Sequence, residues 1–194
     1  MLQIMNRMLR KSYARLENIF KEALPQKNSL RFLDIGCGYR GNFIYIPPEL
    51  YTGIDTDKSA INFLSKKGGG RYLVMDARRL SFDDECFDVI SSISFFHHLC
   101  DAEALLVSRH MRRVLKKNGV AIIADGVYPE SAGNVAGWLI RFFDRGRYIR
   151  RRKALRDIFQ DDFFVDKEYY FVQKVFAYSV LIMIKRGKGD VGKG

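Results

Sequence analysis

Apolar and polar residues follow a pattern that predicts strands and helices in turn along the chain. Short apolar runs of strand length occupy residues 31–35, 51–54, 72–75, 87–92 and 120–124. Between these runs, apolar residues recur at helical spacing over residues 58–66 and 101–117, and we expect Asp101 to cap the second helix and Gly119 to stop it. Such alternation is typical of a parallel sheet with helices on both faces.

The last part of the chain departs from this alternation. Residues 166–173 and 176–185 are close enough in the sequence to pair as an antiparallel hairpin. The longest apolar run, residues 175–184, is about half as long as a membrane span, so we interpret it as a buried strand. The tail, residues 187–194, is rich in glycine and lysine, and we expect it to be disordered.

The first 26 residues form a separate segment in this pattern. Over residues 2–24 the apolar residues share one helical face, the basic residues lie mostly elsewhere, and Pro25 ends the pattern. We favour a helix that packs on the domain or covers its active site. A basic amphipathic helix lying on a membrane surface is the alternative.

Composition narrows the class of protein and of partner. A chain of 194 residues fits one domain, and its net charge of +11 favours anionic partners such as nucleic acid, phosphorylated metabolites or an acidic membrane surface. Cys37, Cys86 and Cys100 are spaced neither as a disulfide framework nor as a metal motif, so we expect reduced thiols and no metal site. With no secretory signal pattern, we expect a cytoplasmic protein, with peripheral contact to a membrane surface left open.

A glycine-rich turn after the first strand carries the strongest chemical signal. Asp34 precedes Gly36-Cys37-Gly38, and a second acid, Asp55, ends the next strand. Glycine lets the backbone approach a ligand closely, and a carboxylate at a strand end can hold both hydroxyls of an adenosine ribose. The same glycines, with Gly41 and an acid nineteen residues after Gly36, also fit the dinucleotide fingerprint.

Further polar residues follow the other predicted strands. Asp76, residues 92–98 and Asp125 all fall at or just beyond a strand end. The carboxyl ends of parallel strands meet at one edge of the sheet, so we expect these residues to converge there with Asp34 and Asp55.

Five segments, in order, resemble the motifs of the class I S-adenosylmethionine-dependent methyltransferases, in the small-molecule, methyltransferase type 11-like branch. They are residues 33–38, 53–55, 75–82, 87–99 and 115–120, with Asn118 where a proline or glycine is common. The resemblance covers residues 30–127 by motif and extends to about residue 185 by topology. It implies an α/β fold: a Rossmann-like, doubly wound, seven-stranded sheet, mostly parallel, with an antiparallel C-terminal hairpin strand.

The resemblance also implies the cofactor and its contacts. S-adenosyl-L-methionine would be bound with Asp55 on the ribose, Asp76 on the adenine amino group and the backbone of Ala77 beside the ring. The full set of candidate cofactor-binding residues is Asp34, Gly36, Cys37, Gly38, Asp55, Thr56, Asp76, Ala77 and Ser92. Cys37 would contribute its backbone rather than its thiol.

Methyl transfer from a sulfonium depends mainly on alignment of donor and acceptor, and it needs a general base only when the acceptor must lose a proton. His97 and His98 are the candidate bases, and Asp125 is a candidate to accept a hydrogen bond from substrate. Structural roles in the pocket wall or in capping are the alternatives. We expect Asp88, at the opposite strand end, to be structural.

Residues 128–164 are where this family commonly builds its substrate lid, within a methyltransferase domain of residues 27–186. Aromatic and basic residues interleave there, which suits an amphiphile with an anionic head or nucleic acid, although a solvated helical face is the simpler interpretation. The candidate substrate-binding residues are Trp138, Arg145, Arg147, Tyr148 and Arg150.

The leading hypothesis is a methyltransferase acting on a small or lipid-linked acceptor that carries phosphate or carboxylate. An RNA or protein methyltransferase docking through its basic surface is the second, disfavoured because no Asn-Pro-Pro-Tyr-type motif follows the fourth strand. A non-catalytic methyltransferase-like partner subunit is the third, and a nicotinamide oxidoreductase is a distant fourth.

Overall fold

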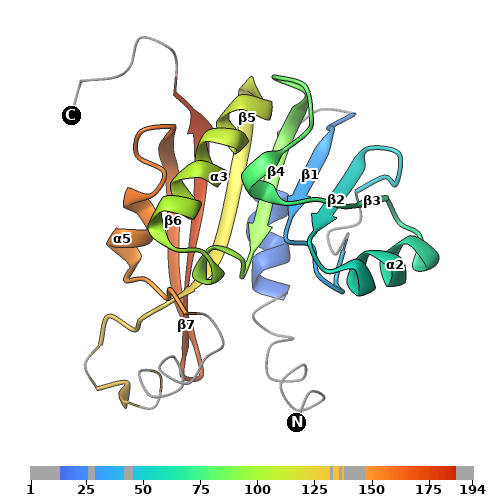
Figure 1. Ribbon diagram of the computed structural model, residues 1–194. Helices are drawn as coiled ribbons and strands as arrows, with labels where there is room; N and C mark the ends of the chain where they lie inside the picture. Colours follow the sequence, from blue (N-terminus) through green and yellow to red (C-terminus); the bar gives the residue numbers. More distant parts are fainter. Residues whose placement is uncertain are drawn as a thin grey trace.

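The computed structural model describes residues 14–25, 29–41, 46–131, 133–135, 137 and 147–186. Its centre is a seven-stranded sheet in the order β3-β2-β1-β4-β5-β7-β6 (Figure 1). The strands are β1 (Phe32–Ile35), β2 (Tyr51–Asp55), β3 (Arg71–Val74), β4 (Phe87–Ile93), β5 (Leu115–Val127), β6 (Phe163–Gln173) and β7 (Phe176–Lys185). β1 to β5 pair in parallel, whereas β7 runs antiparallel to both β5 and β6. The predicted fold class is confirmed.

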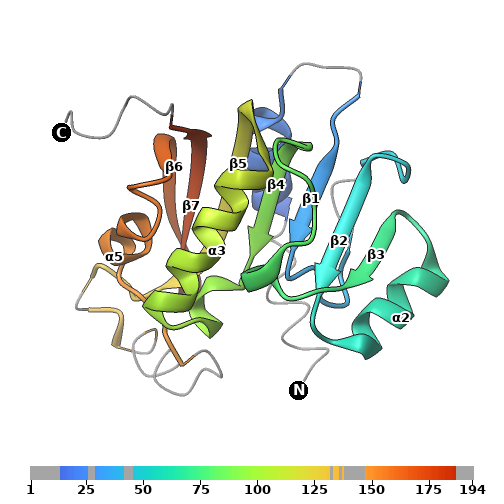
Figure 2. The same cartoon turned by 45° about the horizontal axis from the view of Figure 1, so that its top comes forward.

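Helices cover both faces of the sheet. In the described part of the chain they include α2 (Lys58–Lys67), α3 (Asp101–Val114) and α5 (Arg152–Asp157), the 3-10 helices η1 (Ala77–Arg79) and η2 (Phe96–His98), and a helix over residues 14–23. The helix of residues 14–23 lies on the opposite face of the sheet from α3 (Figures 1 and 2). Among the described residues, no helix has the length and apolar character needed to cross a membrane.

Alternation along the strands divides the core into two clusters, one for each face. Phe32 packs into the cluster that includes the helix of residues 14–23, whereas its neighbour Leu33 packs into the cluster that includes α3. Leu16 and Phe20 are fully buried in the first cluster, so the described half of the predicted N-terminal helix packs on the sheet. The tail of residues 187–194 lies outside the described residues, as do residues 1–13.

The junction of α3 and β5 corrects the sequence prediction. The helix ends at Val114 rather than residue 117, because Leu115 is buried and pairs with Phe87 at the start of β5. Gly119 therefore lies inside the strand and does not stop the helix. A Cβ there would approach the Leu115 side chain to 2.6 Å, so the position needs glycine for space.

The start of α3 is also different from the prediction. The N-cap is Cys100, whose backbone N–H donates to the Glu103 carboxylate at 3.1 Å, and Asp101 is the first helical residue.

Asp88, expected to be structural, is buried at the start of β4. It accepts hydrogen bonds from the Arg31 backbone N–H at 3.1 Å and from Lys116 Nζ at 2.8 Å.

Candidate active site

The glycine loop folds back on the end of β2. The backbone N–H groups of Gly36 and Cys37 both donate to the Ile54 carbonyl, at 2.9 and 3.1 Å. Gly36 has a φ of +71°, and a Cβ there would lie 2.7 Å from the Phe95 ring, so only glycine fits this turn. The loop is thereby fixed between the ends of β2 and β4.

Asp55 lies where this loop meets β2. One carboxylate oxygen accepts the Gly38 N–H and the other accepts the Asp57 N–H, both at 2.9 Å. An ionised carboxylate has about four acceptor positions, so both oxygens keep room for a hydroxyl donor. Asp55 is therefore oriented by backbone and still able to bind a diol.

A cavity of about 490 Å³ opens beside this carboxylate; we call it the glycine-loop cavity. Seven of the predicted site residues line it: Gly36, Gly38, Asp55, Thr56, Asp76, Ala77 and His98. Ser94 and Phe95, from the segment of residues 92–98 expected at this edge, also line it. Arg78, Leu99 and Glu103 line it too and were not among the candidate site residues. Carboxylates are grouped with apolar side chains, a combination that can hold a sugar and a flat base together.

Ser92 is not where its predicted role requires. Its hydroxyl donates to the Ile35 carbonyl at 3.0 Å between β1 and β4, and the side chain is buried. β4 continues to Ile93, and Ser94 then turns the chain with a φ of +55°, which brings Phe95 to the cavity. Ser94 and Phe95 thus replace Ser92 at this wall.

A smaller cavity of about 170 Å³ adjoins the first, shares Gly36 and Gly38 with it, and is lined also by Asp34 and Cys37. Asp34 is buried and accepts hydrogen bonds from Tyr51 Oη at 2.6 Å and Ser91 Oγ at 2.8 Å. Burial raises the pKa of Asp34 to about 6. Burial also raises the pKa of the Cys37 thiol well above its usual range, so that thiol is no nucleophile.

The raised pKa of Asp34 predicts a pH-dependent stability. An exposed aspartate titrates near pH 3.9, so the folded protein holds this proton more tightly than the unfolded chain, and stability falls as pH rises from about 4 to about 6. A difference of about two pKa units corresponds to about 3 kcal/mol. In urea unfolding between pH 4 and pH 7, Asp34→Asn should lack this decrease, whereas Asp83→Asn, at an exposed position, should keep it. Parallel curves for wild type and Asp34→Asn would contradict the assignment.

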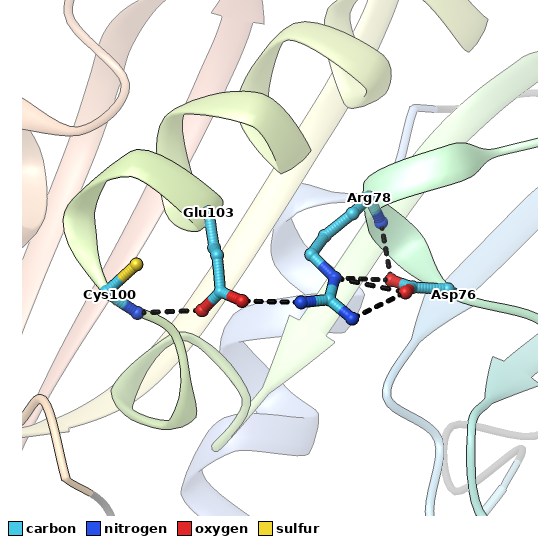
Figure 3. Close-up of polar contacts among 4 residues, drawn as sticks. All are labelled: Asp76, Arg78, Cys100 and Glu103. Atoms are coloured by element: carbon cyan, nitrogen blue, oxygen red, sulfur yellow. Dashed lines mark hydrogen bonds and ion pairs between the residues drawn. The ribbon is translucent and has the colours of Figure 1, made fainter.

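Asp76 and Arg78 form an ion pair at the β3 end of the glycine-loop cavity (Figure 3). The Asp76 carboxylate caps η1 and accepts hydrogen bonds from the Arg78 backbone and guanidinium, which hold the pKa of Asp76 below its usual value. The guanidinium also donates to Glu103 at 2.5 Å, from the first turn of α3.

His97, in η2, and Asp125, near the end of β5, lie in contact. The Nδ1 atom of His97 lies 2.5 Å from Asp125 Oδ1, and the His97 backbone N–H donates to Oδ2 at 3.1 Å. Their side chains are only 11% and 2% exposed. His98, which lines the glycine-loop cavity, packs against His97 with ring centroids 4.1 Å apart and the rings tilted by 45°. Asp125 thus fixes the backbone and ring of His97, and His97 supports His98.

Arg150 is a structural residue, which corrects its predicted role in substrate binding. It is only 8% exposed, and its guanidinium donates to the Phe96 and Leu99 carbonyls at 2.8 Å and to Asp101 at 2.7 Å. The tertiary fold turns this side chain inward, where it holds the ends of η2. Tyr148 adds a backbone hydrogen bond to the His97 carbonyl at 3.0 Å.

Of the other substrate candidates, Arg147 is exposed and the Tyr148 side chain is 43% exposed. Trp138 and Arg145 lie outside the described residues.

We expect Arg150→Met to lower the free energy of unfolding by about 2–4 kcal/mol, because several charge-assisted hydrogen bonds to η2 and the residues after it are lost at once. Arg147→Met, at an exposed position three residues earlier, should change it by less than about 0.5 kcal/mol. Chemical denaturation of both variants measures the difference. Equal free energies of unfolding for the two variants would show that Arg150 does not anchor η2.

A third cavity, of about 710 Å³, lies beyond β5; we call it the basic cavity. It is lined by Tyr128, Pro129, Glu130, Val135, Arg151, Arg152 and Lys153. Arg152 pairs with Glu168 at 2.6 Å and with Glu130 at 3.2 Å. The Tyr128 N–H donates to the Arg150 carbonyl at 3.0 Å, so the segment that anchors η2 also borders this cavity. In the described part of the chain, no group of three His, Cys, Asp or Glu residues could hold a metal ion.

Comparison with known proteins agrees with this geometry. Residues 33–123 match the family described as the methyltransferase domain. The fatty-acid O-methyltransferase of Mycolicibacterium smegmatis is 29% identical over 102 residues, which are 49% of this chain and 36% of that protein. The phthiotriol/phenolphthiotriol dimycocerosates methyltransferase of Mycobacterium leprae is 30% identical over 117 residues, 56% of this chain and 43% of that protein. The chain thus spans less than half the length of either relative.

A solved structure shares the fold over most of the chain. A SAM-dependent methyltransferase from Methanosarcina mazei superposes with a TM-score of 0.71 at 19% identity, covering 87% of this chain and 98% of that one. Three observations point to the same family: the motifs at the sheet edge, the strand order with its antiparallel β7, and the match to the methyltransferase domain. Residues 33–123 are thus similar to the methyltransferase domain family, and the chain shares the fold of a SAM-dependent methyltransferase.

Proposed function

We propose that this protein transfers a methyl group from S-adenosylmethionine to a small or lipid-linked acceptor that carries a phosphate or carboxylate. The observation that carries the proposal is the lining of the glycine-loop cavity, where Asp55, Asp76 and His98 face one space. The basic cavity nearby supplies room and positive charge for the acceptor.

The residues of the glycine-loop cavity fit this cofactor. Asp55 keeps acceptor positions for the ribose hydroxyls, and Asp76 offers a carboxylate for the adenine amino group. Phe95 and Leu99 supply apolar surface that excludes water from the site. When bound, S-adenosylmethionine supplies a methyl group already activated on a sulfonium, so the protein contributes mainly alignment.

His98 is the group we assign to proton transfer, because it is the histidine that lines the cavity. With a hydroxyl acceptor, a ring nitrogen of His98 would take the hydroxyl proton. The acceptor oxygen would take the methyl group as the bond between that carbon and the sulfonium sulfur breaks, and the sulfur would leave as the neutral thioether of S-adenosylhomocysteine. Asp125 and His97 act through position: the carboxylate fixes His97, and His97 packs against His98. His98 is thus the catalytic residue and His97 a positioning residue.

The basic cavity supports an amphiphilic acceptor. Tyr128 and Val135 offer apolar surface, while Arg151 and Lys153 stand beside them and can attract an anionic head, for which the exposed Lys153 would exchange its ion pair with Asp157. The curated relatives named above include a fatty-acid methyltransferase and a phthiotriol dimycocerosates methyltransferase. Their names support a lipid-linked acceptor for this chain.

Two experiments test the proposal. Isothermal titration with S-adenosylmethionine, S-adenosylhomocysteine and, as control, NAD(H) should give binding of the first two alone. Incubation with methyl-labelled cofactor should then label a component of a total lipid extract rather than total RNA. Failure to bind either sulfur compound would overturn the proposal, and labelling of RNA alone would replace the acceptor class.

A further inference from the structure

Arg78 has a position in the glycine-loop cavity that the function described so far leaves unused. It is the second residue of η1 and lines the cavity between two carboxylates, Asp76 and Glu103 (Figure 3). Its Nε and Nη2 atoms donate to Asp76 at 2.7–3.0 Å, and its Nη1 atom donates to Glu103 at 2.5 Å. One guanidinium therefore joins the end of β3 to the start of α3.

Packing alone does not fix the Asp76 carboxylate, because its side chain is 35% exposed. The Arg78 backbone N–H at 2.9 Å and the guanidinium hold it in one plane. A bidentate arginine defines both the position and the orientation of a carboxylate. Without the guanidinium, the Asp76 carboxylate keeps only the hydrogen bond from the Arg78 backbone N–H among those described for it.

Arg78 engages both oxygens of the Asp76 carboxylate. Oδ1 accepts the Arg78 backbone N–H and the Nε–H, and Oδ2 accepts the same Nε–H and the Nη2–H. Three hydrogens thus cover about four acceptor positions, because the Nε–H is shared by the two oxygens. One hydrogen of an exocyclic amino group can take the place that this shared hydrogen only partly fills.

Glu103 keeps Arg78 from turning away. One of its oxygens accepts the guanidinium, and the other accepts the Cys100 N–H at 3.1 Å at the start of α3 (Figure 3). Glu103 is thus held by the helix it belongs to. The start of α3 therefore holds Glu103, Glu103 holds Arg78, and Arg78 holds the Asp76 carboxylate.

We infer that Arg78 is a positioning residue for adenine recognition, which orients the Asp76 carboxylate toward the 6-amino group while Glu103 holds Arg78 in place. This inference rests on the proposed function, since it concerns the same cofactor.

The test compares two ligands that differ at one group. S-adenosylhomocysteine carries the 6-amino group, whereas S-inosylhomocysteine carries an oxygen there. A hydrogen bond to a charged acceptor predicts that the wild-type protein prefers the first by about 10- to 100-fold. In Arg78→Met this preference should fall below about 3-fold, with affinity for S-inosylhomocysteine nearly unchanged. Isothermal titration gives all four dissociation constants.

Arg79→Met is the matched control, because Arg79 is the next residue of η1 and is exposed; it should keep the wild-type preference. In an Asp76→Ala background, Arg78→Met should have no further effect on the preference. Equal weakening of both ligands in folded Arg78→Met would show a merely structural role and overturn the inference, as would an additional effect in the Asp76→Ala background. A wild-type protein that binds neither ligand would reject the proposed function itself, whereas one that binds both equally would reject this inference alone.

Discussion

Replacement of Asp55 by alanine should weaken the binding of S-adenosylmethionine by at least about 100-fold, because two ribose hydroxyls lose a charged acceptor worth about 1.5–3 kcal/mol each. The domain should remain folded. Asp55 ends β2 and is only half-buried, so its two backbone donors, the N–H groups of Gly38 and Asp57, can turn to water at a cost of about 1–2 kcal/mol. Isothermal titration measures the affinity, and circular dichroism checks the fold.

Asp57→Ala is the matched control for this prediction. It removes the same charge two residues away, from the residue that caps α2 by accepting the Ser59 and Ala60 N–H groups. It should cost about 1 kcal/mol of stability and change cofactor affinity by less than about 3-fold. Unchanged affinity in Asp55→Ala, or an equal loss in both variants, would show that Asp55 does not hold the ribose.

Much of the fold follows from local patterns. Each predicted strand in the parallel part is present with its ends shifted by at most one residue, except β5, which begins five residues earlier and ends three residues later than predicted. Strand periodicity and the glycine turn depend on neighbouring residues, so the sequence displays them directly. Parallel strands then bring their carboxyl ends together, and that is why the acids placed by pattern at strand ends, Asp55 and Asp76, border one cavity.

The position and burial of single side chains depend on contacts between segments that are distant in the sequence, so they could not be predicted from local patterns. Arg150 belongs to a run of basic residues that looks alike whether it is solvated or buried, and its contacts to Phe96 and Leu99 lie about fifty residues away. Ser92 and Ser94 are equally polar in the sequence. The positive φ of Ser94, which decides where the strand ends and the cavity wall begins, leaves no mark in a serine.

Glu103 and Arg78 were missed for a similar reason. Their ion pair joins η1 to α3 across 25 positions, and its effect is visible only once both elements stand at the cavity. A local signal for Glu103 did exist, since a glutamate at the third helical position often accepts the N-cap N–H. The cap residue here is Cys100, which is not one of the usual N-cap residues.

Replacement of His98 by glutamine should lower the rate of methyl transfer by about 10²- to 10⁴-fold, the range typical of a lost general base. Cofactor affinity should change by less than about 3-fold, since we propose that the ribose and adenine contacts come from Asp55 and Asp76, which line the same cavity. Single-turnover transfer of labelled methyl to the acceptor found in the lipid extract measures the rate. The expectation applies to an acceptor that carries a proton, because a carboxylate acceptor reacts without a base.

His97→Gln separates the two neighbouring histidines. His97 is held by Asp125 at 2.5 Å and is nearly buried, so its loss should loosen the turn and reduce the rate less than His98→Gln does. Asp125→Asn should reduce the rate of methyl transfer about as much as His97→Gln does, because Asp125 holds the His97 ring. If His97→Gln were the slower variant, the proton would go to His97, in an arrangement where a buried carboxylate orients the base and stabilises its charge. A full rate in His98→Gln with a hydroxyl acceptor would contradict the proton transfer assigned to His98.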